Sequence, residues 1–135
     1  MYKYINPNNK HLNEIKECGS ELLFEIIEML PEEMKKYLQL ISEGIQTKNY
    51  EYISRGVHSV KRSVSYFIDS GNPIFEFCND FENKSRLKME EQRNKSTTVE
   101  SIDFAHDLEE LKEIARIFII EIKQFEEEYK NGKYS

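Results

Sequence analysis

Residues 53–67 read ISRGVHSVKRSVSYF, and the spacing of their apolar side chains is informative about the fold. The apolar side chains recur at intervals of four, three, four and three residues, at Ile53, Val57, Val60, Val64 and Phe67. This spacing lines them up along one face of an α-helix. It therefore predicts a helix that packs one side against other helices. We expect it to end in the loop 69–72, where Gly71 and Asn72 can supply positive φ angles.

Similar apolar stripes occur on both sides of this segment, over residues 22–30, 34–45, 74–81 and 105–125. Between the first two stands Pro31, and because a proline inside a helix costs about 3 kcal/mol, we expect a kink or a break near Met29. The core face of the last stripe is expected to be Ala105, Leu108, Leu111, Ala115, Phe118, Ile122 and Phe125.

The expected helix boundaries follow from capping and breaking residues. A short helix is expected around Asn9–Glu17, and a longer one from Pro73 to about Arg93. Asn94–Thr98 is the most polar stretch and is predicted to be the longest loop. Ser101 is the expected cap of the last helix, which should reach Tyr129 before the stop signal at 131–132.

The composition favours a single helical domain. The chain has 135 residues, within the range of about 100–200 residues for one domain. Its three prolines and five glycines are too few for the many turns of an all-β domain. We predict an all-α fold, an antiparallel up-down four-helix bundle with an additional short N-terminal helix. The single domain is expected to span residues 1–135, with its core at about 8–130.

The net charge of −6 argues against a broad surface for nucleic acid or anionic membranes. Two cysteines, Cys18 and Cys78, form neither a disulfide framework nor a zinc site. No secretory signal pattern is found at the start of the sequence, and no apolar run approaches the length of a membrane span. The expected location is the cytoplasm.

One window reverses the charge of the acidic chain. Residues 52–68 contain no Asp or Glu, but they do contain a histidine and three permanent cations. On a helix, His58 neighbours Ser54, Arg55, Lys61 and Arg62. Because nearby cations disfavour a protonated ring, they keep the imidazole neutral and nucleophilic. They also attract a phosphoryl dianion. The pattern indicates a histidine that accepts and releases a phosphoryl group.

Residues 55–63, RGVHSVKRS, resemble the H-x-x-K-G-S signature of histidine-containing phosphotransfer (HPt) domains. Residues 47–53 are similar to the loop and helix start that precede this signature. Residues 71–82 are similar to the family's return helix, with a small residue or Cys at position 78 and the closing L-E matched by Phe81 and Glu82. The resemblance covers about residues 8–127.

The resemblance implies a phosphorelay intermediate. His58 would accept a phosphoryl group from the aspartate of one receiver domain and pass it to another. Lys61 would hold the phosphoryl oxygens, with Arg62 and Ser63 nearby and Ser54 and Arg55 on the binding face. The implied partners are response-regulator receiver domains and a hybrid histidine kinase. The protein would need no cofactor of its own, since the Mg²⁺ belongs to the receiver; it would lack autokinase activity and be a monomer.

The sequence departs from the family pattern at two places. Arg62 stands where the family usually has Gly, and it could either add phosphate affinity or obstruct docking. The position of the family's usual ring-binding Gln falls on Glu82 if the turn between the two helices carries the extra residues, and on Asp80 if it does not. A carboxylate there would orient the ring and raise its basicity.

We expect an apolar docking patch beside His58, with Tyr50, Ile53, Ser54 and Phe67 as its candidates, although some of these could belong to the core instead. Two alternatives remain: an HPt-like adaptor that binds a receiver or kinase without transfer, and a helical scaffold unrelated to signalling.

The other two histidines are not expected to carry phosphate. His106 has Glu109 where the motif requires Lys, and His11 lies in the N-terminal region. A metal centre is not expected either, because the nearest match to a Glu-x-x-His pair is Asp103 with His106.

Overall fold

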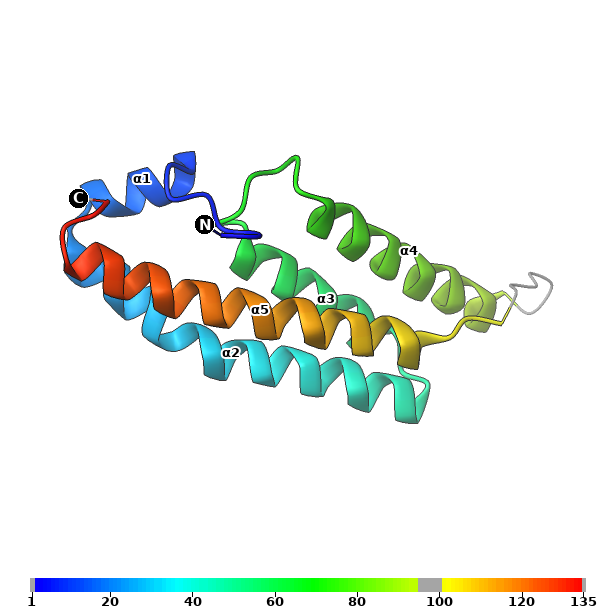
Figure 1. The fold of residues 1–135 in the computed structure, drawn as a ribbon. Coiled ribbons are helices and arrows are strands. Elements are labelled where there is room, and N and C mark those ends of the chain that lie inside the picture. The colour runs from blue at the N-terminus through cyan, green and yellow to red at the C-terminus, as the bar shows by residue number, and fades with distance from the viewer. Residues whose placement is uncertain (1, 95–100, 135) are drawn as a thin grey trace.

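The computed structural model describes residues 2–94 and 101–134. Within these residues the protein is all-helical, with five α-helices and no strand. The helices, shown in Figure 1, are α1 (Lys10–Glu17), α2 (Ser20–Thr47), α3 (Tyr50–Val64), α4 (Pro73–Arg93) and α5 (Phe104–Lys130).

The four longer helices lie lengthwise beside one another, and successive helices run in alternating directions (Figure 1). Helix α2 packs against both α3 and α5, α3 packs against α4, and α1 packs against α2. Helices α4 and α5 meet over a smaller region. Among the described residues, no helix combines the length and the apolar character that crossing a membrane requires.

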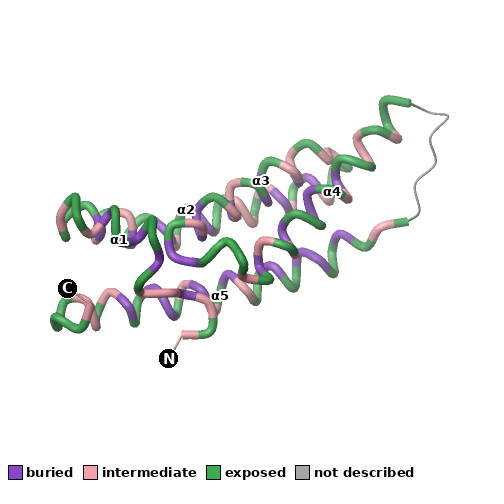
Figure 2. Tube along the Cα trace, turned by 90° about the horizontal axis from the view of Figure 1, so that it is seen from above, coloured by how far each residue is buried: buried purple, intermediate pink, exposed green. Residues whose placement is uncertain are grey.

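The core runs along the inward faces of these helices (Figure 2). Its largest fully buried side chains include Phe67, Phe81, Phe118 and Phe125. Burying a side chain of this size contributes about 1.5–3 kcal/mol. The helices therefore derive most of their stability from this shared apolar face rather than from intrinsic propensity.

The N-terminal segment is fixed to α5 by one buried carboxylate. Glu121 accepts hydrogen bonds from the backbone N–H groups of Lys3, Tyr4 and Ile5 at 2.6, 2.9 and 3.0 Å. The next residue, Asn6, donates its backbone N–H to the carbonyl of Phe67 at 2.9 Å. These bonds connect the start of the chain both to α5 and to the end of the α3 region.

Helix α2 continues through Pro31, so of the kink or break predicted near Met29 the break does not occur. Leu30 and Met34, on either side of the proline, are both buried. Their burial contributes about 1.5–3 kcal/mol each, which offsets the cost of about 3 kcal/mol of an internal proline.

The link between α3 and α4 differs from the expectation. Helix α3 ends at Val64, although Phe67 is fully buried beyond it. The prediction of positive φ at Gly71 and Asn72 is wrong. Asn72 instead has an extended φ of −70° and caps α4, where its side chain accepts a hydrogen bond from the N–H of Ile74 at 3.0 Å.

The N-cap of helix α5 lies two residues after the predicted one. Asp103, not Ser101, is the N-cap, and its side chain accepts a hydrogen bond from the N–H of His106 at 3.0 Å. The shift also changes the inward face of the first turn. Phe104 is buried there, whereas Ala105, which was expected in the core, is exposed.

The remaining boundaries agree closely with the sequence. Helix α4 ends at Arg93, and α5 ends at Lys130, just before Gly132 with its φ of 84°. Beyond Asn94, the loop predicted over 94–98 lies outside the described residues.

Gly56 allows α3 to approach α2 closely. A Cβ added at this position would lie 2.5 Å from Cγ1 of Ile41 and 2.9 Å from the backbone oxygen of Tyr37. The glycine is buried and stands two residues before His58. The missing side chain therefore determines how deeply the His58 segment lies against α2.

Candidate functional site

His58 lies in the second half of α3, at the edge of its buried face. The helix starts at an N-cap, Asn49, whose side chain accepts a hydrogen bond from the N–H of Tyr52. Val57 and Val60 are buried, and their packing fixes the rotation of the helix. The side chain of His58 is 52% exposed. The histidine is therefore held on a rigid element and remains accessible to another molecule.

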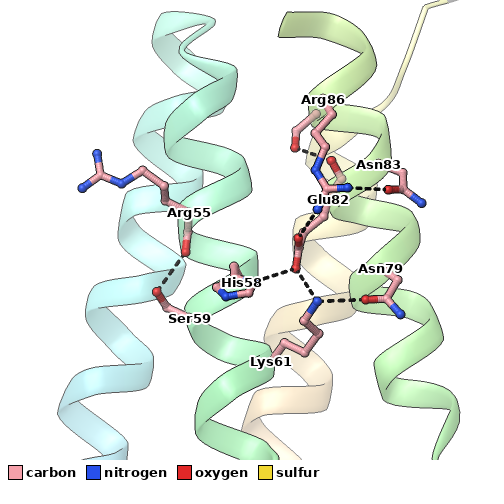
Figure 3. Close-up of polar contacts among 9 residues, drawn as sticks. Arg55, His58, Ser59, Lys61, Asn79, Glu82, Asn83 and Arg86 are labelled. Atoms are coloured by element: carbon pink, nitrogen blue, oxygen red, sulfur yellow. Dashed lines mark hydrogen bonds and ion pairs between the residues drawn. The ribbon is translucent and has the colours of Figure 1, made fainter.

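Glu82 of α4 places a carboxylate beside this ring. Its side chain is only 3% exposed, and its Oε1 lies 3.4 Å from Nδ1 of His58 and 2.9 Å from Nζ of Lys61. Its other oxygen, Oε2, accepts a hydrogen bond from Nη2 of Arg86 at 2.8 Å. Figure 3 shows the carboxylate between the imidazole and the two cations. Burial of this charge is thus compensated by Lys61 and Arg86.

The contacts at Oε1 of Glu82 are ion-pair contacts without aligned hydrogen bonds. Among the described residues this buried atom accepts no conventional hydrogen bond, although Lys61 is close. The 3.4 Å to Nδ1 of His58 is also long for a hydrogen bond. The arrangement thus favours a ring with the proton on Nδ1 and the lone pair on Nε2.

Lys61 connects α3 to α4 at a second point. Its Nζ donates a hydrogen bond to Oδ1 of Asn79 at 2.9 Å. The thiol of Cys78 lies in the core of the same region, and burial raises its pKa to about 12, with a smaller lowering effect from Lys61 and a smaller raising effect from Glu82. The thiol is therefore protonated at neutral pH and is no candidate nucleophile.

Of the two acids considered for the position beside the ring, the structure places Glu82 there. Asp80 is exposed and makes no contact with His58 that we observe. One turn of helix separates Cys78 from Glu82, and both face α3.

Arg62 and Ser63 lie on the α2 side of α3. They line a shallow pocket with Ser59 and Tyr37, and Ser63 is buried. Arg55 points away from Glu82, and its carbonyl accepts the Ser59 hydroxyl at 2.9 Å (Figure 3). The structure therefore brings His58, Lys61 and Glu82 together, and leaves Arg55, Arg62 and Ser63 outside that cluster. Ser54, one turn before His58, is half-buried.

Of the four candidates for the apolar docking patch, two belong to the core. Ile53 and Phe67 are completely buried in the core. The Tyr50 ring is half-buried, with its centroid 5.7 Å from that of Phe104. Ile53 and Phe67 belong to the series of apolar residues spaced four and three apart, which marks the buried face of a helix. They therefore pack in the core and are not available to bind a partner.

The remaining histidines are accompanied by exposed acids. Nε2 of His106 lies 3.0 Å from Oε1 of Glu110, and Nδ1 of His11 lies 3.8 Å from Oε2 of Glu14. Neither has a lysine in the position that Lys61 takes beside His58. Across residues 2–94 and 101–134, we find no cluster of three His, Cys, Asp or Glu side chains that could hold a metal ion.

Sequence reasoning missed two members of the cluster. Arg86 stands four residues after Glu82, a spacing that brings side chains together on a helix and could have been recognised. Asn79 bonds to Lys61 across two helices, 18 residues away, and no local pattern indicates that contact.

Comparison of the chain with protein-family models, with curated proteins and with solved structures gives no match.

Proposed function

We propose that the protein is a histidine phosphotransfer protein of a multistep phosphorelay. The observation that carries the proposal is the cluster of an exposed His58 with a buried carboxylate at Nδ1 and a lysine one turn away. Glu82 orients the ring so that Nε2 is the nucleophile. Lys61, 23% exposed, provides a cation for the phosphoryl oxygens.

In the proposed step, the donor is the aspartyl phosphate of a receiver domain. The lone pair of His58 Nε2 attacks phosphorus, and a P–N bond forms while the P–O bond to the aspartate breaks. The aspartate leaves as a carboxylate with the electron pair of that bond. The ring becomes a cationic phosphoimidazole that keeps its Nδ1 proton, and Glu82 stabilises this charge. Transfer to a second receiver reverses these steps.

The fold supports the same proposal. We interpret α2 to α5 as an antiparallel up-down four-helix bundle and α1 as its additional N-terminal helix, all in one HPt-like domain. The proposed partners are response-regulator receiver domains and a hybrid histidine kinase. The protein would act as a cytoplasmic monomer, and the Mg²⁺ for transfer would belong to the receiver.

Arg62 favours a second candidate function, an HPt-like adaptor that binds a receiver without transfer. This exposed cation stands one turn from His58, where the HPt signature has Gly. In that case the long side chain would keep the receiver's aspartate away from His58 while leaving the surrounding surface free to bind.

The test is phosphoryl transfer from a receiver domain that carries labelled aspartyl phosphate. We expect acid-labile, base-stable label on the wild type and on His106→Gln, but none on His58→Gln. Label that persists in His58→Gln would refute the assignment. Several receivers are needed as donors, because relay pairs are selective.

The same assay separates the alternatives. Receiver binding without label in the wild type would favour the adaptor, and label gained by Arg62→Gly would then identify the obstruction. Neither label nor binding with any receiver would favour a helical scaffold unrelated to signalling.

A further inference from the structure

We propose that the buried carboxylate of Glu82, which lies 3.4 Å from Nδ1 of His58, makes phosphorylated His58 short-lived. The inference rests on the proposed function in taking His58 as the phosphoryl carrier. It adds that the intermediate is adapted for rapid release rather than for storage.

The chemistry depends on the leaving group. When Nδ1 of phosphohistidine is protonated, cleavage of the P–N bond returns the electron pair to Nε2 and releases neutral imidazole. When Nδ1 is unprotonated, the same cleavage must expel an imidazolate anion, which is far slower. In hydrolysis, water attacks phosphorus, its proton goes to the phosphate or to solvent, and the ring keeps its Nδ1 proton. The rate therefore follows the fraction of rings that are protonated on Nδ1.

The geometry gives Glu82 control of that fraction. Its Oε1 lies 3.4 Å from Nδ1 and accepts no conventional hydrogen bond from the described residues. The carboxylate is 3% exposed, so little water screens its interaction with the ring. Lys61 and Arg86 form ion pairs with it at 2.9 and 2.8 Å. A carboxylate oxygen that also pairs with Lys61 therefore faces Nδ1 and can accept a hydrogen bond from it.

The cations on α3 and on the neighbouring α4 have the opposite effect and disfavour a protonated Nδ1. On α3 itself these are Arg55, Lys61 and Arg62, and on α4 the nearest cation is Arg86. Helix α2 contributes Glu33, which lines the pocket beside Ser59 and Arg62 rather than contacting the ring. Glu51 of α3 and Asp80 of α4 are exposed. Among the charged groups that the structure describes here, Glu82 is the one observed in contact with the ring, and its negative charge favours a protonated Nδ1.

The experiment needs no partner protein. Phosphoramidate transfers its phosphoryl group to exposed histidines, with ammonia as the leaving group. His11 and His106 are also exposed. The background protein for these measurements therefore carries His11→Gln and His106→Gln, so that His58 is its one remaining histidine. The rate of phosphate loss is then followed from about pH 5 to pH 9, a range that brackets the unperturbed titration of histidine.

Glu82→Gln preserves the shape and removes the charge. We expect its rate profile to coincide with that of the background in acid. On the alkaline side, loss of phosphate should be about tenfold slower, because one opposite charge at this distance shifts a titration by about one pH unit. Asp80→Asn removes the same charge from an exposed position of α4, and its profile should match the background throughout.

Identical profiles for Glu82→Gln and the background would overturn the proposal, as would an equal change at every pH, which indicates a structural effect. If Glu82→Gln fails to fold, the rate profile of Arg86→Gln tests the proposal instead. Removal of that cation should move the profile toward higher pH, and no movement or the opposite movement would overturn the proposal. Because phosphoramidate bypasses the receiver, this outcome is independent of whether receivers transfer to His58.

Discussion

Replacement of Gly56 by alanine tests how closely α3 lies against α2 at the candidate site. The added Cβ would stand 2.5 Å from Cγ1 of Ile41 and 2.9 Å from the carbonyl oxygen of Tyr37. The isoleucine is completely buried, and the carbonyl belongs to the backbone of α2. Neither atom can move away alone, so the two helices must separate.

The expected free-energy change is the balance of two opposing effects. Overpacking of a well-packed site costs about 1–3 kcal/mol, and a contact with backbone belongs in the upper half of that range. Alanine in place of glycine in a helix recovers about 1 kcal/mol. We therefore expect Gly56→Ala to lower the free energy of unfolding by about 1–2 kcal/mol. For a chain of this length that corresponds to a decrease in Tm of about 3–8 °C.

The assay is urea unfolding followed by circular dichroism, with Gly71→Ala as the matched control. A Cβ at Gly71 meets no atom within 4 Å, and its φ does not require glycine. The control should be neutral or more stable by about 0.4–1 kcal/mol, because alanine restricts the unfolded chain.

The refuting result is a Gly56→Ala protein as stable as the control, which would mean that α3 and α2 are not in close contact at this point. The phosphorylation assays on His58 add a second readout. A displaced α3 would also change the distance from His58 to Glu82, so the variant should label more slowly than Gly71→Ala.

Two further predictions concern groups away from the histidine. Cys78 is buried and its pKa is raised to about 12, so its thiolate is scarce until the pH approaches that value. A thiol reagent at pH 8 should therefore titrate one thiol in the native protein, that of the exposed Cys18, and two thiols in denaturant. Two fast-reacting thiols in the native protein would contradict the burial of Cys78. Glu121→Ala removes a carboxylate that accepts hydrogen bonds from three backbone N–H groups. Urea unfolding should show that the free energy of unfolding falls by about 2–4 kcal/mol. A decrease below about 0.5 kcal/mol, as for a surface site, would mean that Glu121 does not hold the N-terminal segment.

The sequence was sufficient to predict the helices, because their apolar spacing reports which face is buried. It left a kink or a break open at Pro31, and the helix does not break there because burial of Leu30 and Met34 outweighs the local preference of proline. It failed at Ser101, since capping residues two positions apart satisfy similar local rules and tertiary packing of Phe104 selects Asp103.

The candidate site was only partly predictable for a related reason. The relation of His58 to Lys61 is set by helix geometry, so it can be derived from spacing alone. The choice between Glu82 and Asp80 depends on how α3 and α4 are aligned, which the sequence of either helix does not fix. The same applies to the contact of Lys61 with Asn79.

Glu82 is costly as a structural residue. A core position occupied by an apolar side chain of similar volume would avoid the desolvation of a carboxylate, and buried ion pairs are often no better than such a replacement. The charge at Glu82 instead faces a half-exposed imidazole that contributes little to the core. If Glu82 served stability alone, Glu82→Gln would lower the free energy of unfolding without slowing phosphate loss from His58 on the alkaline side. If Glu82 serves the chemistry of the ring, Glu82→Gln should slow phosphate loss on the alkaline side, whatever its effect on the free energy of unfolding.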